Sequence, residues 1–209
     1  FINDCAPAIG CFYNGKPMAS YGDFSMLSFF SDKTVTMGEG GMLLTNNEKL
    51  LSVANIYKHD GRRERGHDLI EGKGFNFRLT EMQAAVGLAQ LNRIENTLKK
   101  KKGIYDKYCK ALEGISKVRI FHPDSNSEVY MHRIIIFVDD APSVIEKLVG
   151  RGIGARSLFH PMHKQPIYDT GESFINTDQL SKTGVCLPSA PTLSSKDIDY
   201  IASCLKDIL

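Results

Sequence analysis

The sequence predicts an α/β protein whose second half is a small α+β domain. Three short apolar segments, at residues 1–3, 24–30 and 42–45, have the length of buried strands and are separated by glycine-rich turns. Two helical patterns follow them. Beyond about residue 101 strand-like and helix-like segments alternate, which is typical of a compact α+β domain. The expected organisation is therefore a first domain at residues 1–100, ending in a long linking helix, and a second domain at residues 101–209.

Turn and cap signals predict where elements of the first domain begin and end. The Asn-Gly pair in Y-N-G-K at residues 13–16 predicts a tight hairpin turn. Asn46 or Asn47 can cap a helix that runs to about residue 59, with leucine, valine and isoleucine on its apolar face. Residues 60–74 are rich in charge and glycine and predict a long loop, a feature that is usually functional or mobile.

The linking helix begins with a clear signal. Thr80 and Gln83 form a T-x-x-Q capping box before the pattern EMQAAVGLAQLNRIE. The helical pattern continues towards residue 112, and Gly103 marks an expected break. The basic run at residues 99–102 lies within this pattern and contains no aromatic residue, so it is expected to be a solvated helix face.

The second domain is predicted from shorter segments. Strands are expected at residues 118–121, 130–138 and near 154–159, and helices at residues 143–151 and 194–209. The sequence contains no internal repeat and no low-complexity segment.

Composition excludes several classes of function. The chain has 209 residues, of which 42% are hydrophobic and 24% charged, as in ordinary globular proteins. Its net charge of +2 gives no electrostatic case for binding nucleic acid. No apolar run approaches the roughly 18 residues that span a bilayer, so no membrane association is expected.

The five cysteines are odd in number and form no C-x-x-C pair. No histidine or cysteine cluster has metal-ligand spacing, so no metal is expected. Reduced thiols and a cytoplasmic location are the simplest interpretation.

Lys33 is the first candidate for chemistry. It follows an apolar strand and precedes the turn G-E-G-G, whose glycines allow close approach of the backbone to a ligand. A lysine so placed suits Schiff-base chemistry, in which a deprotonated amine attacks a carbonyl. The alternative is a surface lysine at the tip of a loop.

Asp4 and Ser28 each follow or end a predicted strand. In an open α/β sheet, ligands bind at the carboxyl ends of the strands, where the Asp4 carboxylate can balance a positive ring nitrogen. It can equally be a helix or turn cap. The Ser28 hydroxyl can donate to a phosphate, or be a tolerated small polar residue.

Eight motifs in order resemble one known family. They are D-x-A-x-A-x-G (4–10), G-K-P (15–17), Y-G-D-F (21–24), S-F-F-x-x-K (28–33), G-E-G-G-M (38–42), GFNFRLTEMQAAVGLAQL (74–91), RSLFHPMHKQPIY (156–168) and LPSAPTL (187–193). Together they resemble the DegT/DnrJ/EryC1/StrS aminotransferases. These are fold type I pyridoxal-phosphate enzymes that act on nucleotide-linked keto sugars. The resemblance implies the aspartate aminotransferase-like fold: the C-terminal part of a large three-layer α/β/α domain, followed by the small domain.

The resemblance also implies roles for the candidates. Lys33 matches the lysine that forms a Schiff base with pyridoxal 5'-phosphate and then moves the proton. Asp4 matches the aspartate that keeps the pyridine nitrogen protonated. Ser28 matches a phosphate-binding hydroxyl, and Asn76 an asparagine that reaches the cofactor phosphate of the other subunit. A homodimer with shared active sites follows from the last assignment.

Substrate positions are implied as well. Within the family, the motifs around Lys33 and Arg156 are most similar to those of perosamine synthases, which aminate a GDP-linked 4-keto-6-deoxy sugar with L-glutamate as donor. Arg156, His160 and His163 match positions near the substrate, with turn or interface residues as the alternative. Relatives with histidine in place of lysine are dehydratases, so Lys33 argues for amino transfer.

Two departures leave alternatives open. Pro7 stands where relatives carry a polar residue beside the cofactor ring. The chain starts at Phe1 without methionine, whereas the family has a long further segment before Asp4, so upstream residues are expected to be missing. A truncated or split chain without activity of its own is the main rival, and a family member acting on another keto sugar is the second.

Overall fold

The computed structural model describes residues 1–64, 66–169 and 171–209, and it divides into two compact units. The first unit comprises residues 1–98 and 124–130, and the second comprises residues 99–123 and 131–209. The chain passes from the first unit to the second after residue 98, close to the expected domain boundary at residue 100. Residues 124–130 join the first unit because β7 (Ser127–Glu128) pairs with β2 (Phe12–Tyr13), a pairing that no sequence signal indicated.

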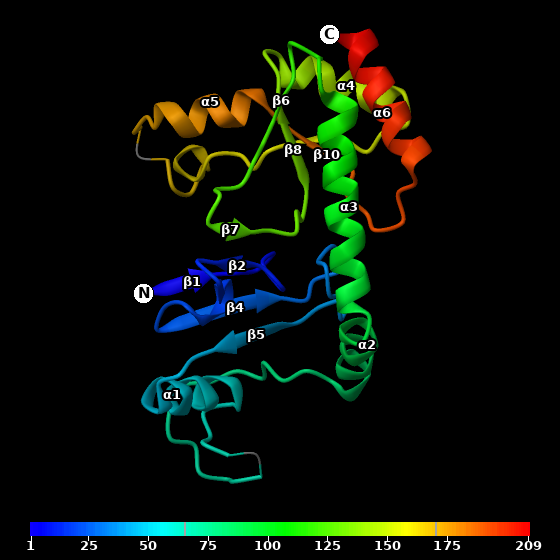
Figure 1. The fold of residues 1–209 in the computed structure, drawn as a ribbon. Coiled ribbons are helices and arrows are strands. Elements are labelled where there is room, and N and C mark those ends of the chain that lie inside the picture. The colour runs from blue at the N-terminus through cyan, green and yellow to red at the C-terminus, as the bar shows by residue number, and fades with distance from the viewer. Residues whose placement is uncertain (65, 170) are drawn as a thin grey trace. The chain divides into compact units, whose positions relative to one another are not determined.

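A three-stranded sheet in the first unit carries two of the candidate residues, Asp4 and Ser28 (Figure 1). β1 (Ile2–Asp4) is parallel to β4 (Phe24–Ser28), and β4 is antiparallel to β5 (Gly41–Leu44). The carboxyl ends of parallel neighbours lie at the same edge of a sheet. Asp4 and Ser28 therefore end their strands at one edge.

The buried core of this unit lies around β4. Cys5, Leu27, Phe29 and Val35 form it, and each has at most 9% of its surface exposed. Leu27 and Phe29 are two residues apart, so their side chains lie on the same side of the strand. Val35, which follows Lys33 by two residues, fixes the loop beyond the strand to this core. The partly buried apolar residues packed against the cluster are Ala8, Ile9, Met18, Ala19, Met37, Leu44 and Ile94.

The predicted hairpin is confirmed. β2 pairs with β3 (Lys16–Pro17), and the two residues between them, Asn14 and Gly15, have φ values of 48° and 71°. Positive φ at both central positions is the requirement of a type I′ turn, which Asn-Gly meets best. A short 3-10 helix, η1 (Met18–Ser20), follows.

Both predicted helix caps of the first unit are confirmed. Asn47 caps α1 (Glu48–Lys58), and Thr80 with Gln83 forms the capping box of α2 (Glu81–Leu91). The expected break near Gly103 is wrong, because the chain leaves the helix at residues 92–93 and α3 (Ile94–Leu112) continues through Gly103. A single glycine costs a helix only about 1 kcal/mol, which the packing of α3 offsets.

The second unit is built on a four-stranded antiparallel sheet. Its order is β6 (Arg119–Ile120), β8 (Ile134–Phe137), β10 (Gly184–Leu187) and β9 (Arg156–Ser157). Its other elements are the rest of α3, then α4 (Ala141–Gly150), η2 (Met162–Lys164), α5 (Ile175–Thr183) and α6 (Ser195–Ile208). β10 and α5 are not among the predicted elements.

The expectation that the basic run at residues 99–102 is solvated is wrong for Lys101. Lys101 is only 5% exposed, and its Nζ donates to the Met131 carbonyl at 3.1 Å. Lys101 lies three residues before Ile104 and seven before Tyr108, so it shares the buried stripe of α3 with them. Among the described residues, no helix is long and apolar enough to cross a membrane.

Candidate functional site

Lys33 lies in the loop between β4 and β5. Its backbone N–H donates to the Phe30 carbonyl at 3.0 Å, and Val35 beyond it is buried. The Lys33 side chain is 19% exposed, and its Nζ lies 3.9 Å from Asp32 Oδ1. A surface lysine normally extends its ammonium into water. The side chain as a whole is instead largely covered by the protein, as its position between the strand end and the buried Val35 allows.

Asp4 ends β1 and remains exposed. Its Oδ1 accepts a hydrogen bond from the Ala6 N–H at 3.0 Å, so the carboxylate caps the turn after the strand. The turn-cap alternative is thus present in the structure. It is compatible with a second role, because a carboxylate has two oxygens and about four acceptor positions.

Ser28 ends β4, at the same edge as Asp4. Its Oγ accepts from the Phe30 N–H at 3.3 Å, and its own N–H donates to the Ala6 carbonyl at 3.4 Å. The turn after β1 and the turn after β4 are therefore joined by a backbone hydrogen bond. The Asp4 carboxylate and the Ser28 hydroxyl thus come from two neighbouring strand ends, and the Lys33 amine comes from the loop that follows the second of them.

Asn76 belongs to a different cluster, at the end of the long loop after α1. It forms an isolated backbone bridge with His59. Its Oδ1 accepts from Arg78 Nε at 2.8 Å, and Arg78 Nη2 also contacts Asp60 Oδ2 at 3.0 Å. Because Arg78 occupies the amide oxygen, the exposed NH₂ group of Asn76 remains as a donor.

The remaining candidates lie in the second unit. Arg156 is exposed on β9 and is paired in register with Cys186. His160 is exposed, and its Nε2 lies 3.2 Å from the Lys164 carbonyl. His163 differs, because its side chain is only 10% exposed and its Nε2 lies 3.0 Å from Asp178 Oδ1.

Asp178 links η2 to α5. Lys164 Nζ contacts the same oxygen at 2.8 Å, and the Phe174 ring packs edge-on against His163 with centroids 4.8 Å apart. The hydrogen bond from Lys164, aided by that from His163, lowers the pKa of the Asp178 carboxyl. His163 thus has an observed structural role in this unit.

This contact predicts a pH-dependent contribution to stability. A carboxyl whose pKa is lowered on folding stabilises the fold above its unfolded pKa, about 3.9, and the contribution is lost as the pH falls through the folded pKa. Asp178→Asn should therefore lower the thermal unfolding midpoint at neutral pH. The difference from wild type should shrink in strong acid. Equal differences at both pH values would contradict this assignment.

Sequence reasoning missed the residues that hold the Lys33 loop. The Thr36 hydroxyl accepts from the Gly38 N–H at 3.0 Å, and Gln83 Nε2 donates to the Glu39 carbonyl at 3.2 Å. The capping box indicated one role of Gln83, but no local signal predicts a contact that spans 44 residues.

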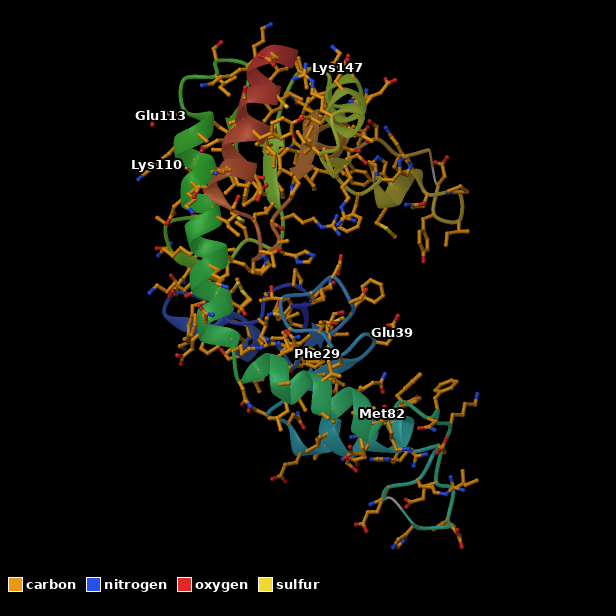
Figure 2. The ribbon with its side chains drawn as sticks, turned by 90° about the vertical axis from the view of Figure 1, so that its right-hand side faces the viewer. Phe29, Glu39, Met82, Lys110, Glu113 and Lys147 are labelled. Carbon is orange, nitrogen blue, oxygen red and sulfur yellow. The ribbon has the colours of Figure 1, made fainter. Side chains whose placement is uncertain are left out.

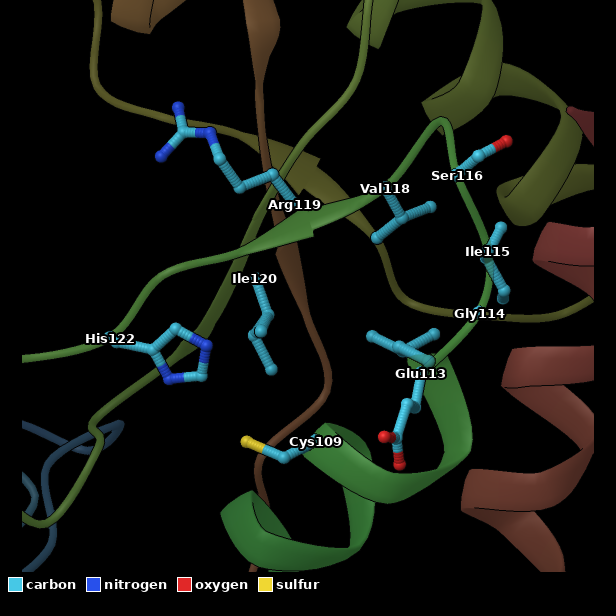
Figure 3. Close-up of a pocket in the computed structure, with 10 residues that line it drawn as sticks. Cys109, Glu113, Gly114, Ile115, Ser116, Val118, Arg119, Ile120 and His122 are labelled. Atoms are coloured by element: carbon cyan, nitrogen blue, oxygen red, sulfur yellow. The ribbon is translucent and has the colours of Figure 1, made fainter.

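Two cavities lie away from these residues. One, of about 900 Å³, is apolar and lies between β4, β5 and α1. The other, of about 490 Å³ and lined by Cys109, Glu113 and His122 among others, lies between the end of α3 and β6 (Figure 3). Lys33, Asp4 and Ser28 line neither. Within the described residues, no group of three or more His, Cys, Asp or Glu side chains could hold a metal ion.

Known proteins resemble the chain in sequence. The profile of the DegT/DnrJ/EryC1/StrS aminotransferase family matches residues 1–206. GDP-perosamine synthase of Escherichia coli O157:H7 is 32% identical over 214 residues, covering 99% of this chain and 57% of that protein. UDP-4-amino-4,6-dideoxy-N-acetyl-beta-L-altrosamine transaminase of Campylobacter jejuni (serotype O:23/36, strain 81-176) is 29% identical over 220 residues, covering 100% and 58%. The chain thus spans somewhat more than half the length of these relatives.

Solved structures share the fold. PseC of Helicobacter pylori, an aminotransferase involved in the biosynthesis of pseudoaminic acid, has a TM-score of 0.93 at 22% identity, covering 100% of this chain and 59% of that one. The aminotransferase TlmJ of Streptoalloteichus hindustanus has a TM-score of 0.92 at 20% identity, covering 99% and 57%. These likenesses confirm the predicted α/β fold of pyridoxal-phosphate-dependent transferases.

Proposed function

This chain belongs to the DegT/DnrJ/EryC1/StrS aminotransferase family, and on that premise we propose that it carries the reactive lysine of a nucleotide-sugar aminotransferase. The observation that carries the proposal is the parallel pairing of β1 and β4. It places Asp4 and Ser28 at strand ends on one edge of the sheet, and the loop that follows β4 carries Lys33, whose side chain is 19% exposed. The family is dependent on pyridoxal phosphate.

The side chains fit that cofactor chemically. Pyridoxal phosphate supplies an electron sink once its aldehyde has reacted with an amine. In our proposal Lys33 Nζ would hold the cofactor through its aldehyde, with loss of water, and would move the proton after the amino donor has displaced it. The Asp4 carboxylate, with acceptor positions beyond the Ala6 bond, would accept the N–H of the pyridine ring.

Ser28 and Asn76 are the proposed phosphate contacts. The Ser28 oxygen already accepts from the Phe30 N–H, which leaves its O–H as a donor to a phosphate oxygen. Asn76 has its oxygen held by Arg78, so its NH₂ group is the end that can reach outward. We propose that it reaches the cofactor phosphate of a second copy, which makes the active form a homodimer.

For the substrate we propose a nucleotide-linked 4-keto-6-deoxy sugar, with L-glutamate as the amino donor. The GDP-perosamine synthases at 32% identity support this choice. The relative named as an altrosamine transaminase supports the second candidate, a different keto sugar. Arg156 and His160 are the proposed substrate contacts, whereas His163 offers only its second ring nitrogen because Asp178 holds the first. We propose a cytoplasmic location, on the cysteine pattern.

The test has two stages. The purified protein is incubated with pyridoxal phosphate, reduced with borohydride and digested, and the cofactor adduct is located by mass spectrometry. We expect it on the peptide that contains Lys33. An adduct on another lysine, or none, would refute the assignment, and none at all would favour the rival of an inactive fragment.

In the second stage, L-glutamate and a panel of nucleotide-linked keto sugars are supplied, and 2-oxoglutarate is measured. Release with GDP-4-keto-6-deoxymannose above all others supports the first substrate. Preference for a UDP-linked sugar selects the second candidate. No release with any sugar would remove the proposal of amino transfer to sugars by this protein.

A further inference from the structure

We infer that Gln83 is a positioning residue, which holds the loop bearing Lys33 against α2. The loop comprises residues 30–40 and is called the lysine loop below. The inference rests on the proposed function of Lys33, but its structural half can be tested without any cofactor. Figure 2 marks the three parts concerned: Phe29 where the loop begins, Glu39 in its glycine-rich turn, and Met82 in the first turn of α2.

The two ends of the lysine loop meet at Phe29. The Phe29 N–H donates to the Gly40 carbonyl at 2.8 Å, and the Phe29 carbonyl accepts from the Met37 N–H at 2.9 Å. The Thr36 hydroxyl donates to the same carbonyl at 3.4 Å. Phe29 itself is 4% exposed. The loop is therefore closed on a buried residue, and Lys33 lies within the closed segment.

Gln83 contacts the far side of this loop. Its Nε2 donates to the Glu39 carbonyl at 3.2 Å. Its Oε1 accepts from the Thr80 N–H at 2.9 Å and from the Thr80 hydroxyl at 3.0 Å. The capping box thus holds the amide oxygen, which directs the NH₂ group of Gln83 towards Glu39. One side chain begins the helix and fixes the turn.

Packing supports the same contact one turn further along α2. A Cβ added at Gly87 would lie 2.2 Å from Met37 Cε and 2.9 Å from Met37 Cγ. Residues 83 and 87 lie on the same face of a helix. The side chain of Met37 therefore packs directly against the backbone of Gly87, where any larger residue would collide with it. A Cβ at Gly40 would similarly lie 2.9 Å from Leu79 Cδ2, just before the helix.

These contacts form a continuous path from α2 to Lys33. Gln83 holds Glu39, the next residue Gly40 is bonded to Phe29, and the Lys33 N–H is bonded to Phe30. Displacement of the turn would consequently move the segment that carries the amine. Because a displacement of about 1 Å at a reacting group can cost a hundredfold in rate, such anchoring matters for chemistry.

The test uses two variants that separate the roles of Gln83. Gln83→Glu keeps the capping box, since a carboxylate accepts from Thr80 equally well, but it loses the donor to the Glu39 carbonyl. Thr80→Ala does the reverse: it removes the hydroxyl that caps the helix, whereas the Thr80 backbone N–H still holds the Gln83 amide oxygen and leaves the NH₂ group directed at Glu39. Amide hydrogen exchange of residues 33–41 is measured without cofactor. Borohydride trapping of pyridoxal phosphate on Lys33 and the visible absorbance of the bound cofactor against pH are measured separately.

We expect Gln83→Glu to accelerate exchange in the lysine loop and to slow trapping, each by about fivefold, the net effect of losing one solvent-exposed hydrogen bond. The midpoint of the absorbance titration should shift as well. Thr80→Ala should lower the unfolding temperature and leave the exchange pattern of the loop, the trapping and the titration as in wild type. If Gln83→Glu matches wild type, or if both variants act alike, the inference is overturned.

A second pair of variants tests the packing independently. Gly87→Ala leaves Gln83 and the cap intact but forces Met37 to move, so it should loosen the same loop. Gly103→Ala is its control, because a Cβ there meets nothing within 4 Å. Equal loop exchange in the two would count against the inference. Failure of wild-type Lys33 to trap the cofactor would refute the proposed function alone, because hydrogen exchange still decides the contact.

Discussion

Replacing Lys33 by alanine is expected to abolish the covalent bond with pyridoxal phosphate and to lower amino transfer by at least about 10²–10⁴-fold. That range is what loss of a positioned acid–base group alone costs, and loss of the nucleophile adds to it. Stability should change little, because the ion pair of Lys33 Nζ with its neighbour Asp32 is long, at 3.9 Å, and such pairs contribute little. The measurements are the visible absorbance of bound cofactor and the rate of 2-oxoglutarate release.

Two controls make this result specific. Lys33→Arg keeps the positive charge but offers no amine that can lose its proton, so it should be as inactive as the alanine variant. Lys49→Ala removes an exposed lysine from the first turn of α1 and should retain wild-type absorbance and activity. Normal absorbance in Lys33→Ala would show that another lysine binds the cofactor.

Local chemistry accounts for the elements that the sequence predicts well. The Asn14-Gly15 turn, the Asn47 cap and the Thr80–Gln83 capping box each depend on residues within four positions of one another. The backbone conformations and hydrogen bonds that these turns and caps require are nearly independent of the rest of the fold. The sequence therefore predicts these turns and caps correctly without knowledge of the rest of the fold.

Elements that depend on distant partners are the ones that sequence reasoning missed. β10 is a run of four residues, all buried, and a run so short has no periodicity to distinguish a strand from a buried helix. Only its pairing with β8 and β9 makes it a strand. Lys101 similarly reads as solvated beside three other lysines, and its burial depends on the packing of α3 and on the Met131 carbonyl.

The candidate site divides in the same way. Lys33, Asp4 and Ser28 could be selected from the sequence because each stands at the end of an apolar run. The contact of His163 with Asp178 spans 15 residues and that of Gln83 with Glu39 spans 44, so neither has a local signature. The residues proposed to react could thus be nominated from the sequence, where they remain predictions, whereas those that hold elements in position were visible only in the folded chain.

Gly61→Ala should be among the most damaging changes to the first unit, through the loop that precedes Asn76. Gly61 is buried with a φ of +84°, and a Cβ there would lie 2.0 Å from the Gly72 carbonyl oxygen. The Gly61 carbonyl also accepts from the Glu71 and Gly72 N–H groups at 2.8 and 3.2 Å. The Gly72 backbone cannot move aside as a flexible side chain can, so the segments around Gly61 and Gly72 must separate.

The control is Gly66→Ala in the same loop, where φ is +90° and a Cβ would meet nothing within 4 Å. Both variants carry the cost of about 1–2 kcal/mol for a left-handed alanine. Gly61→Ala should cost about 1–3 kcal/mol more in the free energy of unfolding, as overpacking does, and it should expose the Glu71 and Gly72 amides to exchange. Cofactor binding by the dimer should weaken in Gly61→Ala alone if Asn76 reaches the phosphate of the partner. Equal stability and equal exchange in the two variants would show that the close approach of Gly61 to Gly72 does not hold this loop.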